Sequence, residues 1–130
     1  MKNILIVSNS DTCRSRMAQE ILNSFGRGMK ISTAGVLVGN SVPDVVCQVM
    51  EQNGYDFSRR KPCDVATYTQ QTWDYVITLC PEAEEVQKEM QGVVRKYVSF
   101  NFADPFRGGI HADDEQEERV VALYNAMHKE

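Results

Sequence analysis

The fold is decided by the stretch NILIV at residues 3–7 and the stretch SNSDTCRS that follows it at residues 8–15. After Asn3 the first stretch is continuously apolar and rich in β-branched residues, which is typical of a strand buried on both faces of a parallel sheet. The second stretch is small and polar, and from Arg14 onward apolar residues recur at helical spacing up to a glycine stop. We therefore expect a strand, a loop and a helix in direct succession.

The same alternation continues along the chain. We expect further strands at residues 30–33, 73–79 and 94–100, and further helices at residues 43–53, 81–90 and 113–128. Strands that alternate with helices imply right-handed crossovers and a parallel sheet covered on both faces. The expected fold class is therefore α/β, a three-layer α/β/α domain with a four-stranded parallel sheet over residues 1–130. Ligands of such sheets bind beyond the carboxyl ends of the strands, which directs attention to the first loop.

Composition narrows the class of protein. The chain has a formal net charge of −4 and a sequence pI near 5.2, which argues against broad nucleic-acid binding. The small basic cluster Arg59, Arg60 and Lys61 is interpreted as a solvated loop. No apolar run approaches a membrane span and no cleavable signal pattern follows Met1, so we expect a cytoplasmic protein that does not contact membranes. The four cysteines lack the paired spacing of a zinc site, and we expect no metal or cofactor.

The loop at residues 8–15 has two interpretations. Its backbone N–H groups and the helix N-terminus can form an anion site, and Arg14 can bind a tetrahedral oxyanion through two hydrogen bonds. Alternatively, it is a polar strand-to-helix turn in which Ser10 or Thr12 caps the helix. The loop lacks the G-K-[ST] ending of a nucleotide-binding loop, so ATP and GTP are not the expected ligands.

The loop resembles the signature of the low-molecular-weight tyrosine phosphatase family, Cys-x-x-x-x-x-Arg-[Ser/Thr] directly after the first strand. Ser8 stands at the cysteine position, Arg14 at the arginine, and Ser15 at the hydroxyl that supports the nucleophile. The resemblance continues, and nearly spans the chain, through Met17-Ala18, Thr33-Ala34-Gly35, Gly54-Tyr55-Asp56-Phe57-Ser58-Arg59 and Ala103-Asp104-Pro105. It implies that the oxyanion is bound by Asn9, Ser10, Asp11, Thr12, Cys13, Arg14 and Ser15, and that Asp104 is the general acid.

The branch within the family stays open. Cys80 falls where the thioredoxin-coupled arsenate reductases carry their second redox cysteine, and the chain length is similar to theirs. However, Gln87 stands where their third cysteine is usual, Phe106 resembles the phosphatases, and Thr12 resembles the arginine-phosphatase branch. Cys80 is thus either a redox thiol or a buried strand-end residue. The implied ligands are phosphate, arsenate or a phosphorylated protein, with a thioredoxin-like reductant if the protein is a reductase.

Serine at position 8 changes the expected chemistry. In the family, a thiolate attacks phosphorus or arsenic, and a cysteine beside a helix N-terminus and an arginine ionises readily. A serine alcohol does not, so Ser8 is expected to leave anion binding intact and to prevent the covalent step. It is either an engineered replacement of cysteine or a natural loss that leaves a phosphate-binding pseudoenzyme, and both explanations stay open.

Other residues near the loop are interpreted more simply. Cys13 is expected to point away from the oxyanion, which disfavours it as a substitute nucleophile. Asp11 stands where the family usually has asparagine, and its carboxylate would oppose an anion unless it points outward or is neutralised. Gln19 replaces a glutamate that some arsenate reductases use near a monovalent cation. We interpret Cys47 and Cys63 as structural and assign no role to His111 or His128.

Overall fold

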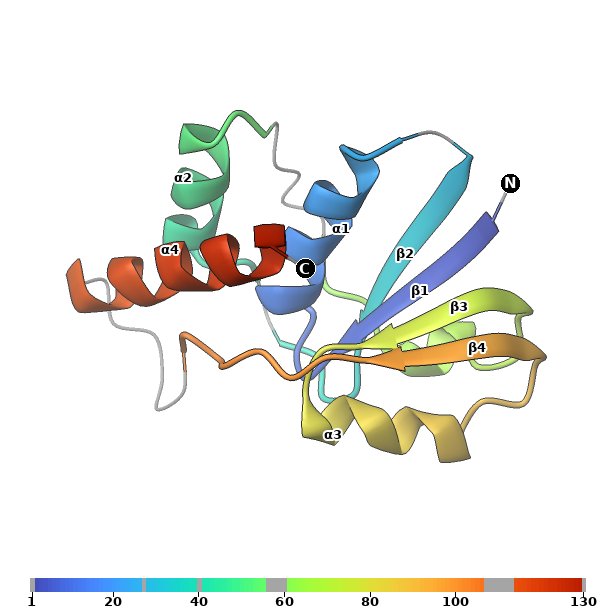
Figure 1. Cartoon of the computed structure of the whole chain (residues 1–130). Coiled ribbons are helices and arrows are strands. Elements are labelled where there is room, and N and C mark those ends of the chain that lie inside the picture. Colours follow the sequence, from blue (N-terminus) through green and yellow to red (C-terminus); the bar gives the residue numbers. More distant parts are fainter. Residues whose placement is uncertain (1, 27, 40, 56–60, 107–113, 130) are drawn as a thin grey trace.

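A computed structural model of the chain describes residues 2–26, 28–39, 41–55, 61–106 and 114–129, and Figure 1 shows its strands and helices. The strands are β1 (Lys2–Ser8), β2 (Met29–Gly35), β3 (Trp73–Thr78) and β4 (Val94–Ser99). The helices are α1 (Arg14–Asn23), α2 (Asp44–Gln52), α3 (Pro81–Glu84) and α4 (Asp114–Lys129), with the 3-10 turns η1 (Val65–Tyr68) and η2 (Glu85–Lys88). The predicted order of strands and helices is therefore confirmed.

The four strands form one parallel sheet in the order β2-β1-β3-β4. Strand β1 pairs with β2 from Lys2↔Met29 to Ser8↔Gly35 and with β3 on its other side. Since the chain leaves β1 for β2 on one side and later returns to β3 on the other, the order of strands switches beside β1. The loop after β1 therefore lies where an open parallel sheet binds its ligands.

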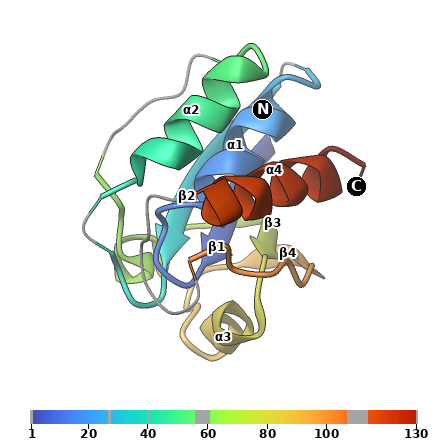
Figure 2. The same cartoon turned by 90° about the vertical axis from the view of Figure 1, so that its left-hand side faces the viewer.

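Strand β1 divides the core into two layers of side chains. Ile4 and Ile6 pack with apolar residues of α1, α2 and α4 on one face of the sheet. Leu5 and Val7 pack on the other face with residues of η1, α3 and η2. Figures 1 and 2 show the same division, with α1, α2 and α4 on one side of the sheet and α3 on the other. The expected three-layer α/β/α fold is confirmed, and burial on both faces explains why β1 is continuously apolar.

Residues 81–90 differ from the expected single helix. They form only one turn of α-helix, α3, followed by the 3-10 turn η2. The two buried side chains of this segment are Ala83 and Val86, three residues apart, and a 3-10 turn places such residues on one face. Helix α1 also ends earlier than its apolar periodicity suggests, at Asn23, and leaves Phe25 64% exposed.

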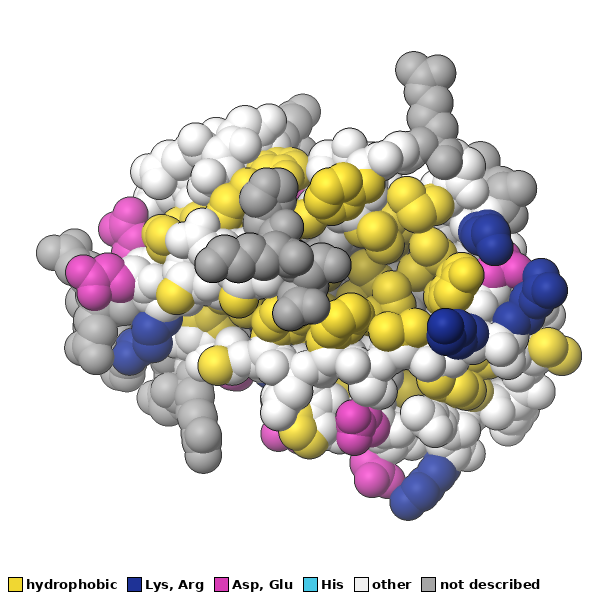
Figure 3. All heavy atoms as spheres, in the orientation of Figure 1, with side chains coloured by type: hydrophobic (Ala, Val, Ile, Leu, Met, Phe, Trp, Pro, Cys, Tyr) yellow, Lys and Arg dark blue, Asp and Glu magenta, His cyan; other side chains and the backbone are white. Residues whose placement is uncertain are grey.

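Apolar side chains of the sheet remain partly uncovered on the face that carries α1. They line a groove of about 380 Å³ with residues of β1, β3, β4, α1 and the end of α4, among them Tyr75, Phe100 and Met127. Figure 3 shows hydrophobic side chains gathered on this face. Within the described parts of the chain, no helix combines the length and the apolar character needed to cross a membrane.

Candidate functional site

The loop between β1 and α1 lies alongside the end of β2 and the residues after it. The amides of Val36, Leu37 and Gly39 donate hydrogen bonds to the carbonyl oxygens of Ser8, Asn9 and Ser10, at 3.1, 2.8 and 2.9 Å respectively. The backbones also come very close together. A Cβ atom on Gly35 would lie 2.7 Å from the carbonyl carbon of Ser10 and 2.9 Å from the Asp11 nitrogen. The shape of the loop therefore depends on main-chain contacts and on the absence of a side chain at position 35.

Asp11 turns the loop. Its φ is 59°, in the left-handed region, where aspartate and asparagine occur more readily than other residues with side chains. The side chain is fully buried, and its Oδ1 accepts a hydrogen bond from the Ser15 hydroxyl at 2.7 Å. Its Oδ2 accepts one from the Cys63 amide at 2.8 Å. Both oxygens of the carboxylate are thus hydrogen-bonded, one to Ser15 and the other to the segment that leads into η1.

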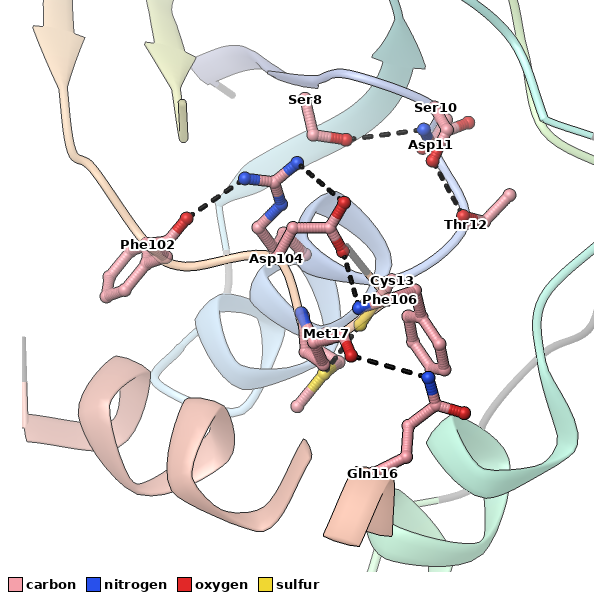
Figure 4. A network of polar contacts seen from close by, with 12 residues as sticks. Ser8, Ser10, Asp11, Thr12, Cys13, Met17, Phe102, Asp104, Phe106 and Gln116 are labelled. Atoms are coloured by element: carbon pink, nitrogen blue, oxygen red, sulfur yellow. Dashed lines mark hydrogen bonds and ion pairs between the residues drawn. The ribbon is translucent and has the colours of Figure 1, made fainter. Parts of the chain in front are cut away.

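Ser8, at the end of β1, is only 2% exposed. Its hydroxyl oxygen accepts a hydrogen bond from the Asp11 amide at 3.3 Å, as Figure 4 shows. Among the described residues, no hydrogen bond joins this hydroxyl to a histidine or a carboxylate. The alcohol thus has a donor that holds it in the loop and no base in contact that would activate it.

The interpretation of the loop as a capped turn is wrong. Helix α1 begins at Arg14, its N-cap residue is Cys13, and no side chain forms a cap hydrogen bond there. Instead, the hydroxyls of Ser10 and Thr12 bond to each other at 2.7 Å. Within the described part of the chain, no side chain caps the start of α1, and the N–H donors of a helix N-terminus favour an anion.

Arg14 and Asp104 meet although 90 positions separate them. Arg14 is 7% exposed; one guanidinium nitrogen donates to the Phe102 carbonyl at 2.9 Å, and another lies 3.8 Å from Asp104 Oδ2. The other oxygen of Asp104 accepts from the Phe106 amide at 2.9 Å, which forms an Asx-turn. Pro105, between these two residues, accepts a 3.4 Å hydrogen bond from Gln116 of α4 (Figure 4). The segment after β4 is thereby held between Arg14 and the last helix.

Cys13 is turned away from the centre of the loop. Its sulfur lies 3.7 Å from Met17 Sδ, inside the core beneath α1. Burial, followed by the negative charge of Asp104, raises the pKa of the Cys13 thiol, and the Arg14 charge acts in the opposite direction. A protonated buried thiol is a weak nucleophile, so the surroundings of Cys13 do not suit a nucleophilic role.

Cys80 directly precedes α3, at the same edge of the sheet as the loop, but it packs in the core on the face opposite Cys13. It is 1% exposed, and burial raises the pKa of its thiol, whereas the Ala83 amide and the Arg14 charge lower it. Cys47 is also buried, and Cys63 is half-buried; none of the four cysteines forms a disulfide. The structure thus gives Cys80 the surroundings of a core residue.

These surroundings predict which thiols react. We expect a maleimide at neutral pH to label Cys63 rapidly and Cys13, Cys47 and Cys80 only as fast as the chain unfolds. Burial blocks access to all three, and it also raises the pKa of the Cys13 and Cys80 thiols. Peptide mapping by mass spectrometry after timed labelling gives the four rates. Cys63→Ser is the control and should remove the fast phase. Fast labelling of Cys80 in the folded chain would contradict the prediction.

Comparison with known proteins identifies the family of the chain. The family of the low molecular weight phosphotyrosine protein phosphatases matches residues 3–130. The chain belongs to this family. It is 26% identical over 129 residues to a probable low molecular weight protein-tyrosine-phosphatase, EpsP, of Ralstonia nicotianae, covering 92% of this chain and 89% of that one.

An arsenate reductase is also among the relatives of this phosphatase-family chain. It is the glutaredoxin arsenate reductase of Synechocystis, 29% identical over 80 residues, a match that covers 62% of this chain and 61% of that protein. In fold, the chain resembles the tyrosine phosphatase Wzb of Escherichia coli, solved in complex with sulphate. The TM-score is 0.76 at 19% identity, covering 99% of this chain and 93% of the other. Both activities thus occur among proteins similar to this one.

Three parts of the phosphatase-family site were not expected from the sequence. They are the close approach of Gly35 to the loop, the Cys63 amide that binds Asp11, and the Phe102 carbonyl that binds Arg14. Two are main-chain groups, whose hydrogen bonds do not depend on residue type. For Gly35 a signal existed in Thr33-Ala34-Gly35, since a glycine that ends a strand beside a polar loop suggests close backbone contact.

Proposed function

We propose that the chain binds a tetrahedral oxyanion, such as phosphate, arsenate or a phosphorylated side chain, in the loop at residues 8–15, and that it forms no covalent intermediate while serine stands at position 8. The observation that carries the proposal is the position of Arg14. It is buried at the start of α1, where none of the described side chains forms a cap hydrogen bond. A guanidinium has five N–H donors, and the Phe102 carbonyl takes one of them, so donors remain for an oxyanion.

Asp104 supports the enzyme side of the proposal. It lies beside Arg14, is about one-third exposed, and also lines a cavity of about 320 Å³ between its own segment and α4. With a cysteine at position 8, the sulfur would attack phosphorus, the bond from phosphorus to the leaving oxygen would break, and Asp104 would give that oxygen a proton. With Ser8 the group at this position is an alcohol that contacts no base among the described residues, and the reaction stops at binding.

Phosphate-type ligands are the first candidates. Arsenate reduction would also need a second thiol that reaches the arsenic adduct, and Cys80 is a buried residue whose thiol has a raised pKa. Arsenate reduction is kept as a second candidate because of the Synechocystis relative and because Cys80 lies at the same edge of the sheet as the loop. Cys80→Ser in a chain whose position 8 is again cysteine separates the two, because it would remove arsenate reduction and leave phosphatase activity.

The proposal is tested on the chain as it stands. Calorimetric titration should detect binding of phosphate and arsenate, and the same protein should release no phenol from an aryl phosphate above the buffer rate. If neither anion binds, anion recognition by the loop is wrong. If phenol is released, and Arg14→Ala stops the release, then Ser8 supports turnover and the non-covalent part of the proposal is wrong.

A further inference from the structure

The hydrogen bonds of Asp11 decide where the proton of a neighbouring hydroxyl lies. An ionised carboxylate is an acceptor only. Asp11 Oδ2 accepts the Cys63 amide hydrogen, and Oδ1 accepts the hydroxyl hydrogen of Ser15. A hydroxyl has one hydrogen to donate, so the Ser15 hydrogen is directed toward Asp11 and is not available to the side chain at position 8.

An amide at position 11 would reverse this bond. Its oxygen can accept the hydrogen of the Cys63 amide, as Asp11 Oδ2 does now. Its NH₂ group can then donate to the Ser15 oxygen, which releases the hydroxyl hydrogen of Ser15. In that arrangement the Ser15 hydrogen would become available to the residue at position 8, which is the role that the family resemblance implies for this hydroxyl. The substitution Asp11→Asn, which replaces one carboxylate oxygen by NH₂, would therefore decide whether the Ser15 hydroxyl can donate its hydrogen to the residue at position 8.

The charge of Asp11, like its hydrogen bonds, disfavours an ionised thiol at position 8. The Asp11 amide donates to Ser8 Oγ at 3.3 Å, and the same residue, three positions along the chain from Ser8, carries a fully buried carboxylate. A thiolate at position 8 would place a second negative charge near the first, in an environment that screens charges poorly. A like charge disfavours ionisation and raises a thiol pKa. An uncharged serine has no such conflict with Asp11.

We propose that Asp11 is a positioning residue that turns the Ser15 hydroxyl away from position 8, and that Ser8 and Asp11 form a matched pair in a loop built around an uncharged first residue. On this view Ser8 is not an isolated replacement of the family's cysteine. The proposal rests on the proposed function in taking position 8 as the nucleophile position. Its test measures a thiol and not a bound anion, so the two can fail separately.

The test is a set of four proteins, each with Ser8→Cys to supply a thiol at position 8 and Cys63→Ser to remove the half-buried thiol. The first has no further change, the second adds Asp11→Asn, the third adds Ser15→Ala, and the fourth adds both. The rate of iodoacetamide alkylation at position 8 is followed by mass spectrometry from pH 5 to pH 10 in buffer without phosphate or arsenate. The midpoint of each profile gives the thiol pKa, which is safer than one rate because nucleophilicity falls as pKa falls.

With Asp11 present, we expect the thiol pKa at position 8 to be no lower than its ordinary value of about 8.5, and Ser15→Ala to leave it unchanged. Asp11→Asn should lower it by at least about one pH unit, since a repulsive charge is lost and a hydroxyl donor is gained. In that background, and only there, Ser15→Ala should raise it again. Such dependence of one substitution on the other is the mark of coupled residues.

Two results would overturn the proposal. One is a thiol pKa with Asp11 present that is as low as with Asp11→Asn, and the other is a Ser15→Ala effect that is equal in both backgrounds. Thermal unfolding shows whether each protein folds. If the Asp11→Asn proteins do not fold, the proposal is judged from the two proteins that keep Asp11, one with Ser15 and one with Ser15→Ala. An unchanged profile after Ser15→Ala supports the proposal, and a raised pKa overturns it. Calorimetry on the unmutated chain tests anion binding independently.

Discussion

Gly35→Ala is expected to abolish anion binding while the sheet remains folded. The added Cβ would lie 2.7 Å from the Ser10 carbonyl carbon, 2.9 Å from the Asn9 oxygen and 2.9 Å from the Asp11 nitrogen. All three are backbone atoms, so no side chain can rotate to make room, and the loop must move away from the end of β2. Overpacking of this kind costs about 1–3 kcal/mol of stability. The displaced loop no longer presents its N–H groups around one point.

The measurement is calorimetry with phosphate beside thermal unfolding of the same samples. Gly92→Ala is the matched control, because its Cβ would clash with the backbone oxygen of Gln71, in a turn held to Thr69 by backbone hydrogen bonds and not in contact with the loop. We expect Gly92→Ala to lower the unfolding temperature at least as much as Gly35→Ala but to leave phosphate affinity unchanged. Unchanged phosphate affinity in Gly35→Ala would mean that the loop does not depend on its contact with β2.

Arg14→Ala should weaken phosphate and arsenate binding at least about tenfold, and a hundredfold or more if the guanidinium holds the oxyanion through two hydrogen bonds. The variant also leaves the Phe102 carbonyl without its donor and Asp104 without its nearby cation. Arg14→Lys should recover only part of the affinity, because an ammonium group keeps the charge but lacks the planar fork of donors.

Arg95→Ala is the control for charge alone. Arg95 is an exposed residue of β4 and lies 3.6 Å from Asp74, at the opposite end of the strands from the loop. Because an exposed charge at that distance is screened by salt, we expect its loss to leave the anion dissociation constant unchanged. Equal loss of affinity in Arg14→Ala and Arg95→Ala would show that the anion responds to overall charge and not to a site.

The pattern of apolar residues was sufficient to predict the strand, loop and helix that begin the chain and the parallel sheet. The central strand β1 had to be buried on both faces, and each helix needed one apolar stripe, so the periodicity carries the information. It failed at residues 81–90, where an acidic segment with two apolar contacts became one turn of α-helix and a 3-10 turn. The residues alone do not distinguish these two kinds of helix over so short a length.

The site was less accessible from the sequence. Arg14 was expected to bind an anion because of its place at a helix start, but only the family resemblance linked it to Asp104, which lies beyond three further strands. The role of Asp11 depends on a Cys63 amide that is 52 residues away. Such contacts depend on which distant segments of the chain lie side by side in the fold. The local pattern of residue types does not predict them.

The loop is held to the residues after β2 by hydrogen bonds from Val36, Leu37 and Gly39 to loop carbonyl groups. These bonds do not depend on which side chains the loop carries. The side chain at position 8 can therefore change while the loop keeps its shape. A descendant that loses catalysis in this way keeps a formed receptor for its former substrate, which selection can reuse as a sensor or a competitor of its active relatives.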